Sequence, residues 1–401
     1  MHALEGVRLI DFGQYLAGPF GPMVVGDLGA DVIKVEPVAG DGMRMAGGPF
    51  FGCQRGKRSI AIDLKKPRGI ELALMLVERA DIVHHNMTAG VAKRLGIGYE
   101  DCKRVKPEIV YCNTWAYGLE GPLAHFGGLD PLYQASAGLE YEQGPVREGN
   151  APNYLRFGMT DTANAMLSVV GCLAALYHQR VSGEGQELWT SLLDGGSMFA
   201  SDAVLVDGEA VARPRLDKGQ NGTDALYRLY DTQEGWIQIA AVEDKHWEAL
   251  CGALGAPDLA ADPRFATPAA RAENRKQLES LLEPRFATRT SLVWTRLLDA
   301  VGVPNEMAFD SKGGERVLFD GDNERLGLVA EYDHALFGRM RQFGSLIDFS
   351  ETPGLIHGPP PLVGEHTVEI LEWLGIGEAD HDELKSSGVV YWPDDDYAWG
   401  V

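Results

Sequence analysis

The chain has 401 residues, of which 45% are hydrophobic and 23% are charged. This is an ordinary globular composition, which excludes collagen, a long coiled coil and a wholly disordered protein. The 58 acidic residues outnumber the 36 basic ones, which gives a net charge of −22. A protein this acidic is a poor partner for nucleic acid or for an anionic membrane surface.

The cysteines and the apolar runs bear on the compartment. The 5 cysteines include no C-x-x-C pair, and an odd number without such a pair is typical of reduced, intracellular thiols. The chain begins almost directly with the strand-like run 7–12, without the features of a signal peptide. The apolar stretch 165–177 is shorter than the ~18 residues that cross a bilayer. We therefore expect a cytoplasmic protein that does not span a membrane.

The first half of the chain alternates strand and helix signals. Short apolar runs predict strands over residues 7–12, 31–36, 60–64, 81–86, 108–113 and 187–192. Helical periodicity follows Pro19 and Pro67, and the strongest helical run begins at Asp161 and ends at Gly183. Strands and helices that alternate through short links predict a parallel α/β sheet.

The second half has a different character. Residues 201–221 become polar and contain proline and glycine, which is typical of a linker. Residues 222–325 predict a smaller α+β unit, with a strand at 236–242 and helices around 246–254, 271–282 and 292–300. The tail 352–375 is a Pro-rich coil followed by a short helix.

Several well-known motifs are absent from the sequence. A strand, a turn, a helix and a second strand ending in Glu36 are similar to the start of a dinucleotide-binding fold, whose fingerprint is G-x-G-x-x-G. Here the turn is GQYLAGPFG, so the glycine spacing fails and a nucleotide-dependent oxidoreductase is a disfavoured alternative. No H-E-x-x-H, G-x-S-x-G or zinc-spaced Cys/His set occurs, so no metal site is predicted.

Five segments, in a fixed order, carry a family resemblance: LEGVRLIDFGQYLAGPF, LGADVIKVEP, GKRSIAIDLKKPRG, GCLAALYHQRVSGEGQELWTSLLDG and FSETPGLIHGPPPLVGEHTVEIL. Together they resemble the class III CoA-transferase family, which includes formyl-CoA:oxalate and carnitine CoA-transferases and, as a relative, α-methylacyl-CoA racemase. The resemblance covers most of residues 4–195 and about 340–390, and it is weak over 215–330.

The resemblance implies a fold and an activity. The implied fold is a large Rossmann-like α/β domain built from residues 1–200 and 326–401, a smaller domain between them, and two interlocked subunits of a homodimer. The implied activity moves CoA from an acyl-CoA to a free carboxylic acid. Acyl-CoA is then a substrate, and no permanently bound cofactor is expected.

Asp161 aligns with the nucleophilic aspartate of the family. A carboxylate that attacks a thioester gives a mixed anhydride, which the released CoA thiolate converts into an aspartyl-CoA thioester. At the start of a helix, backbone N–H groups and the macrodipole would keep this carboxylate ionised. Without the resemblance, Asp161 would be interpreted as a helix N-cap that contributes ~1 kcal/mol.

The resemblance also implies a set of CoA-binding residues. Lys65 and Arg94 align with cations near the CoA phosphates, which need Lys or Arg partners. Arg44 is the expected substitute for an arginine of formyl-CoA transferases, at whose position Pro37 stands here. The other implied ligand-contacting residues are Gln14, Tyr15, Leu16, Ala17, Ile62, Asn86, Met87, Thr88, Leu129 and Asp130. The side chains at 14–16 differ from those of formyl-CoA transferases, which implies a different acceptor acid.

One position separates the transferases from the racemases. Racemases carry a histidine in a G-H-D segment, whereas this chain has Leu129 in the segment GLDPLYQASAG. Without a second base, proton exchange at an α-carbon lacks a partner, so a racemase or epimerase is the disfavoured alternative. Asp130 is then either a second acid of the site or a structural residue. A CoA-binding protein without turnover is a further alternative.

Overall fold

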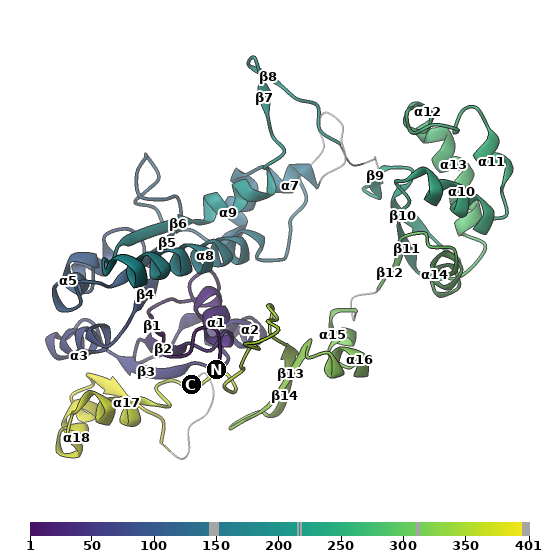
Figure 1. Ribbon diagram of the computed structural model, residues 1–401. Helices are drawn as coiled ribbons and strands as arrows, with labels where there is room; N and C mark the ends of the chain where they lie inside the picture. Colours follow the sequence, from purple (N-terminus) through teal and green to yellow (C-terminus); the bar gives the residue numbers. More distant parts are fainter. Residues whose placement is uncertain (144–151, 215, 217–218, 310–312, 395–401) are drawn as a thin grey trace. The chain divides into compact units, whose positions relative to one another are not determined.

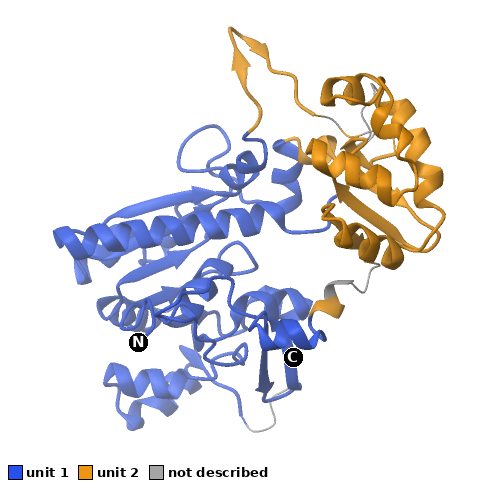
Figure 2. Cartoon of the chain, turned by 45° about the vertical axis from the view of Figure 1, so that its right-hand side comes forward, with its two compact units in different colours: residues 1–137, 155–201, 318–401 blue, residues 138–154, 202–317 orange. Residues whose placement is uncertain are grey.

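The computed structural model describes residues 1–143, 152–214, 216, 219–309 and 313–394. These residues form two compact units, shown in different colours in Figure 2. Unit 1 consists of residues 1–137, 155–201 and 318–401, and unit 2 consists of residues 138–154 and 202–317. Unit 1 therefore draws on both ends of the chain.

A seven-stranded sheet forms the centre of unit 1 (Figure 1). Its strand order is β15-β3-β2-β1-β4-β5-β6, in which β1 to β6 run parallel and β15 pairs antiparallel with β3 at the edge. The strands are β1 (Arg8–Asp11), β2 (Asp31–Glu36), β3 (Arg58–Ile62), β4 (Ile82–His85), β5 (Val110–Trp115), β6 (Glu187–Ser191) and β15 (Val390–Tyr391). The predicted parallel α/β sheet is confirmed.

The strand order fixes where a ligand is expected. The series β3-β2-β1-β4-β5-β6 is that of a doubly wound sheet, and the order changes direction between β1 and β4. Sheets of this kind bind ligands beyond the carboxyl ends of the strands at that point, because the flanking loops diverge there and leave a crevice. The loops that follow β1 and β4 are therefore the first place to look for a site.

The remaining elements of unit 1 are helices and one hairpin. The helices are α1 (Phe20–Asp27), the 3₁₀ turn η1 (Gly42–Ala46), α2 (Gly48–Gln54), α3 (Pro67–Glu78), α4 (Val91–Arg94), α5 (Tyr99–Val105), α6 (Asp130–Ser136), α8 (Met159–Ser182), α9 (Leu192–Phe199), α16 (Gly321–Arg325), α17 (Thr367–Leu374) and α18 (Glu378–Ser386). The hairpin consists of β13 (Val329–His334) and β14 (Gly338–Phe343).

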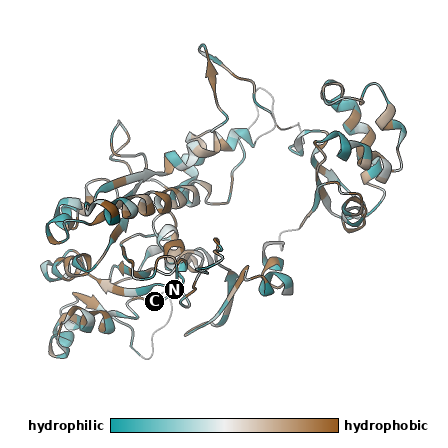
Figure 3. Ribbon diagram, in the orientation of Figure 1, coloured by the Kyte–Doolittle hydropathy of each residue, from teal (hydrophilic) through white to brown (hydrophobic). Residues whose placement is uncertain are grey.

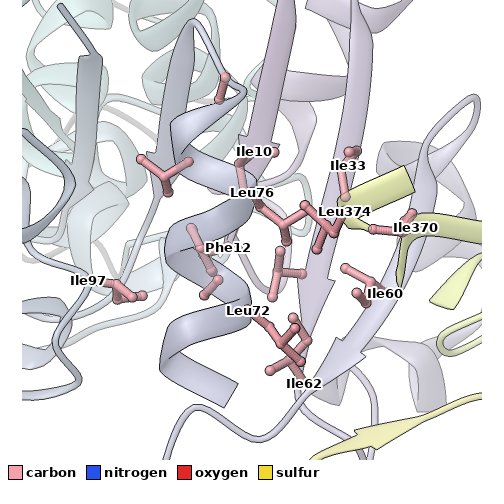
Figure 4. Close-up of a cluster of buried hydrophobic side chains, with 14 of the residues drawn as sticks. Ile10, Phe12, Ile33, Ile60, Ile62, Leu72, Leu76, Ile97, Ile370 and Leu374 are labelled. Atoms are coloured by element: carbon pink, nitrogen blue, oxygen red, sulfur yellow. The ribbon is translucent and has the colours of Figure 1, made fainter. Parts of the chain in front are cut away.

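Both faces of the sheet are buried. Successive residues of a strand point to opposite faces, so Ile10 of β1 joins a core cluster with α3 and α17, whereas Leu9 joins a second cluster with α1 and α8. Figure 4 shows the first cluster, with Leu72 of α3 and Ile370 of α17 among its members. Burial on two faces explains why apolar residues such as Leu9 and Ile10 occupy successive positions in a strand rather than alternating with polar ones.

The helix α8 is long and apolar. It spans 24 residues, and its most apolar window of 18 residues has a mean hydropathy of 1.3. Half of the residues in that window are buried. Figure 3 shows hydrophobic residues along much of this helix. By length and composition α8 could cross a membrane, and it is the one helix among the described residues that could. Its buried side packs on α1 and the sheet, and core helices of this kind commonly reach the same hydropathy. Gly183 ends α8 at a φ of 78°, as predicted.

Unit 2 has its own sheet and core. Strands β9 (Gly222–Asp224), β10 (Tyr227–Asp231), β11 (Trp236–Ala240) and β12 (Asn305–Ala308) form an antiparallel sheet in the order β12-β11-β10-β9. The helices are α7 (Leu139–Glu142), α10 (Asp244–Ala253), α11 (Asp258–Ala261), α12 (Pro268–Glu273), α13 (Arg275–Phe286), α14 (Ser291–Ala300) and α15 (Gly313–Val317). Trp247, Phe286 and Trp294 are buried at its core.

The boundaries of the two units differ from those expected from the sequence. The described residues 138–143 and 152–154 belong to unit 2, whereas the sequence predicts that they belong to the large domain, and Glu142 pairs there with Arg213. Unit 2 ends at residue 317 rather than at 325. The expected linker 201–221 contains the small hairpin of β7 (Leu205–Val206) and β8 (Glu209–Ala210), and its residues 215, 217 and 218 lie outside the described residues.

A fully buried ion pair lies beneath the carboxyl end of β1. The Lys57 Nζ is 2.8 Å from Asp11 Oδ2, and it also donates to the Pro19 carbonyl and to Gln54 Oε1. The two charged side chains are 1% and 0% exposed. Burial alone would raise the pKa of Asp11, but the ammonium groups of Lys57 and Lys34 lower it below its usual value. Each of the two side chains can therefore stay charged in the core only because the other is present.

Replacing Lys57 by Met should lower the free energy of unfolding by about 3–5 kcal/mol, because Asp11 would stay buried without its cation. Urea denaturation at neutral pH measures this quantity. Lys103→Met is the control, since Lys103 is exposed on α5, and it should change stability by less than about 0.5 kcal/mol. Equal stabilities for Lys57→Met and the wild type would contradict the role of the buried pair.

Candidate active site

A cavity of about 340 Å³ opens in unit 1 at the carboxyl ends of β1, β4 and β5. It therefore lies where the strand order changes direction, as expected for a doubly wound sheet. The lining residues are Phe12, Gln14, Tyr15 and Ala17 after β1; Asn86, Met87, Thr88 and Val91 after β4; Thr114, Trp115 and Ala116 around the end of β5; and Gly127, Gly128, Leu129, Asp161 and Leu192.

Many of the residues implied by the family resemblance meet in this cavity. Eight of them line it: Gln14, Tyr15, Ala17, Asn86, Met87, Thr88, Leu129 and Asp161. They come from loops that are far apart in the sequence and from the first turn of α8. The strand order explains why these segments converge, since β1 and β4 are neighbours in the sheet.

Three other predicted residues occupy different positions. The Arg44 guanidinium is 3% exposed and makes a bidentate pair with Glu36, at 2.7 and 2.9 Å, while its third nitrogen donates to the Pro361 carbonyl. The structure therefore corrects the prediction that Arg44 contacts CoA, because its donors already serve the protein itself. Ile62 is 1% exposed within the core under α3, and Leu16 packs against the cluster of α1 and α8 rather than lining the cavity.

The two predicted phosphate-binding cations are exposed. Lys65 follows β3, and Arg94 ends α4, whose first residue Val91 lines the cavity. Within the part of the chain that the structure describes, neither side chain takes part in an ion pair. Their role in CoA binding stays a prediction.

Asp130 caps the helix that carries Asp161. Its Oδ1 accepts hydrogen bonds from the backbone N–H of Thr160 at 2.8 Å, from the Thr160 hydroxyl at 2.6 Å and from the backbone N–H of Asp161 at 3.1 Å. Its second oxygen accepts from the Gln134 side chain. Asp130 is 6% exposed and does not line the cavity. The first turn of α6 is thereby joined to the first turn of α8.

The capping by Asp130 changes the expected electrostatics of Asp161. Asp161 is the third residue of α8, so it is not an N-cap, and its half-buried side chain lines the cavity. The prediction that helix N–H groups keep it ionised is wrong, because the N–H groups of Thr160 and Asp161 serve Asp130 instead. Burial raises the pKa of Asp161 to about 7, and the Asp130 charge adds to this effect. Near neutral pH both protonation states are therefore populated.

Several residues of the cavity are not among those predicted from the sequence. Thr114, Trp115 and Ala116 lie at the end of β5, beside the loop after β4. The rule that open α/β sheets bind ligands at the carboxyl ends of their strands could have found them. Gly128 has a local reason for being glycine, since a Cβ there would lie 2.1 Å from the Tyr133 hydroxyl. The need for glycine depends on how the Tyr133 ring folds back from α6, which the sequence alone does not show.

A model of CoA-transferase family III matches residues 4–367 of this chain. The chain belongs to this family. The succinyl-CoA:glutarate CoA-transferase of Mus musculus is 32% identical over 402 residues, which cover 97% of this chain and 91% of that protein. The succinyl-CoA:mesaconate CoA-transferase of Haloarcula hispanica is 32% identical, over 94% of this chain and 98% of that protein.

A solved structure has the same fold. The CAIB/BAIF family protein from Brucella suis superposes with a TM-score of 0.80 at 29% identity, over 93% of this chain and 99% of that one. The present chain is thus a class III CoA-transferase, an enzyme that moves CoA between an acyl-CoA and a carboxylate. The differing acids in the relatives' names show that identities near 32% do not fix the substrates.

Asp161→Asn should raise the stability of the protein at alkaline pH. A folded pKa raised from 3.8 to about 7 contributes stability that is complete below the unfolded value and is lost as the pH rises through the folded one. The variant should therefore exceed the wild type by roughly 1–3 kcal/mol near pH 8, less than the full shift because the carboxylate is partly exposed.

Thermal unfolding at a series of pH values measures the difference between the two proteins. The difference should shrink as the pH falls to about 4, where the wild-type carboxyl is neutral as well. A difference that does not depend on pH would show that Asp161 has an ordinary pKa.

Proposed function

We propose that this enzyme transfers CoA through covalent intermediates on Asp161. The observation that carries the proposal is the composition of the cavity wall. Among the described residues that line it, Asp161 is the one carboxylate, and no lysine, histidine or cysteine lines it. The other nucleophilic groups there are the hydroxyls of Tyr15, Thr88 and Thr114. A hydroxyl needs a base to become a nucleophile near neutral pH, whereas a carboxylate attacks without one.

The reaction follows from carboxylate chemistry. An Asp161 oxygen attacks the thioester carbonyl carbon, the carbon–sulfur bond breaks, and a mixed anhydride forms as CoA leaves as a thiolate. The thiolate then attacks the Asp161 carbonyl carbon and releases the donor acid, which leaves an aspartyl-CoA thioester. The acceptor acid attacks this thioester, and the thiolate finally attacks the acceptor carbonyl, which restores Asp161. Covalent catalysis conserves the thioester's energy, and no resident cofactor is needed.

The size of the cavity indicates which part of the substrate it holds. A volume of about 340 Å³ is at the low end for ligand sites, so it suits the acyl thioester rather than the whole of CoA. The nucleotide end then extends over the protein surface. Lys65 and Arg94 are exposed near the carboxyl ends of the strands, and we propose that they bind its phosphates.

The structure favours a transferase over a racemase. Leu129 lines the cavity and is 63% exposed, so the position where a racemase carries its histidine presents hydrocarbon here. A racemase needs two acid–base groups on opposite faces of the α-carbon, and Asp161 is the one titratable carboxyl or imidazole among the described lining residues. A CoA-binding protein without turnover is distinguished by the experiment below.

Assembly and compartment are further parts of the proposal. We propose a homodimer, which is supported by the apolar face of α8, where Val170, Tyr177 and Val181 are between 66% and 74% exposed. A second copy of the chain is a suitable cover for such a face. We also propose a cytoplasmic location, supported by five cysteines that are all buried and unpaired.

The decisive experiment is trapping of the covalent intermediate. Wild-type protein incubated with an acyl-CoA and hydroxylamine should accumulate a hydroxamate at Asp161, detected by peptide mass spectrometry. Asp161→Ala should lower the rate of exchange between acyl-CoAs and acids by at least about a thousandfold. Asp322→Ala, at an exposed position on α16, is the control and should keep wild-type activity. Full activity in Asp161→Ala would overturn the mechanism.

Arg94→Ala and Lys65→Ala should each raise the KM for acyl-CoA by about two- to fivefold with little change in kcat, because an exposed ion pair contributes at most about 1 kcal/mol. The difference from the wild type should shrink as the salt concentration rises, since salt screens exposed charges. Lys103→Ala, an exposed lysine on α5, should leave KM unchanged. If both KM values stay at the wild-type level, these residues do not bind the phosphates.

A further inference from the structure

The loop of residues 13–15, which forms one wall of the cavity, is held entirely by side chains. Each of its six backbone polar groups bonds to a side chain rather than to another backbone group. The bonds are Gly13 N to Asp11 Oδ1 (2.7 Å), Gly13 O from Lys34 Nζ (2.9 Å), Gln14 N to Asn86 Oδ1 (2.9 Å), Gln14 O from Asn86 Nδ2 (2.8 Å), Tyr15 N to Asp41 Oδ1 (3.2 Å) and Tyr15 O from Cys53 Sγ (3.4 Å). The conformation of this loop is therefore imposed from outside it.

Tyr15 has a backbone conformation that its own side chain disfavours. Its φ is 62°, and the other non-glycine residues with a positive φ in the described part of the chain are Asp207 and Gln220. A bulky residue rarely adopts this left-handed region, because its Cβ approaches the neighbouring carbonyl oxygen. Such strain persists where the surroundings fix it, and it is concentrated at functional sites.

A buried ion pair fixes the two ends of this loop. Lys34 Nζ lies 2.9 Å from Asp41 Oδ2, and both side chains are 0% exposed. Lys34 also holds the Gly13 carbonyl, while the second oxygen of Asp41 holds the N–H groups of Tyr15 and Met43. The Lys34–Asp41 pair, anchored on β2 through Lys34, thus bonds to the residue before Gln14 and to the residue after it.

The ring of Tyr15 is positioned as well as its backbone. A Cβ added to Gly42 would lie 3.1 Å from the Tyr15 hydroxyl oxygen and 3.4 Å from the ring carbon that bears it. The phenol end therefore rests where residue 42 has no side chain. Even so, Tyr15 is 48% exposed, and it lines the same cavity as Asp161.

We propose that Tyr15 is a fixed wall that sets the size of the carboxylic acid accepted at Asp161, and that Lys34 and Asp41 are its positioning residues. The proposal rests on the function proposed above. In that reaction the donor and the acceptor acid are each bonded to Asp161 in turn, so each must fit the cavity that Tyr15 shares. A side chain that is held in place excludes acids that are too large for the cavity, whereas a mobile side chain would move aside and admit them.

Tyr15→Asn tests the wall itself. Asparagine adopts the left-handed conformation readily, so the loop should keep its shape while the ring is removed. We expect kcat/KM for a branched acid, relative to a short linear acid, to rise about tenfold. Tyr15→Phe keeps the ring and should keep the wild-type ratio. An unchanged ratio in Tyr15→Asn would overturn the proposal.

Asp41→Asn tests the positioning pair, because it removes the charge opposite Lys34 but leaves an oxygen for the Tyr15 N–H. The ratio between branched and linear acids should rise here too, by a smaller factor, with the KM for acyl-CoA largely retained. Asp27→Asn is the matched control, since it breaks another buried pair, with Arg55 at 2.6 Å, which does not bond to residues 13–15. An equal rise in Asp27→Asn would show a general loosening and would overturn the positioning role.

Two further measurements protect the test against failure of one variant. Gly42→Ala serves if Asp41→Asn does not fold. Its methyl group would displace the phenol without changing the ion pair, and it should alter the ratio of kcat/KM between branched and linear acids. If the wild type exchanges no acid at all, the proposed function fails, and calorimetric titration with branched and linear acyl-CoAs takes the place of kinetics. Stronger relative binding of the branched acyl-CoA to Tyr15→Asn would still support the wall, and an equal preference would overturn it.

Discussion

The carboxylate of Asp130 is the group on which the rest of the site depends. It accepts hydrogen bonds from the N–H groups of Thr160 and Asp161, so it fixes the first turn of α8 and the position of Asp161 within that turn. These N–H groups are then not available to stabilise a charged Asp161. The Asp130 carboxylate also places a second negative charge near Asp161. Asp130 therefore positions Asp161 from α6, while burial, to which the Asp130 charge adds, raises the pKa of Asp161 to about 7.

The loop of residues 13–15, which also lines the cavity, is held by a comparable arrangement of buried charges. Asp11, Lys34, Asp41 and Lys57 are each at most 3% exposed, and between them they hold the loop that follows β1. Buried ion pairs add little net stability over well-packed hydrocarbon. Loss of either partner nevertheless lowers the stability strongly, because it leaves the other charge buried alone. Their position beside the cavity is consistent with a preorganised site, in which loop geometry is fixed before the substrate arrives.

Much of the fold could be predicted from the sequence, because β1, β2, β4 and β5 are buried on both faces and therefore contain successive apolar residues. The two residues of β15 offered no such pattern, since its place at the edge of the sheet depends on contacts with β3. The resemblance located Asp161 but could not give its pKa. That pKa depends on burial in the folded chain and on Asp130, a residue of another helix 31 positions earlier. The prediction for Arg44 is wrong for a similar reason, because only the fold of η1 brings its guanidinium back to Glu36 at the end of β2.

Transfer of an oxygen atom tests the central claim most directly. In the proposed mechanism the last step leaves one oxygen of the acceptor acid in the Asp161 carboxyl group. A single turnover of a stoichiometric acyl-CoA with an acid labelled in both oxygens by the heavy isotope should place one heavy oxygen in the peptide that contains Asp161, as read by mass spectrometry. An unlabelled peptide after complete formation of the new acyl-CoA would contradict a covalent role for this residue.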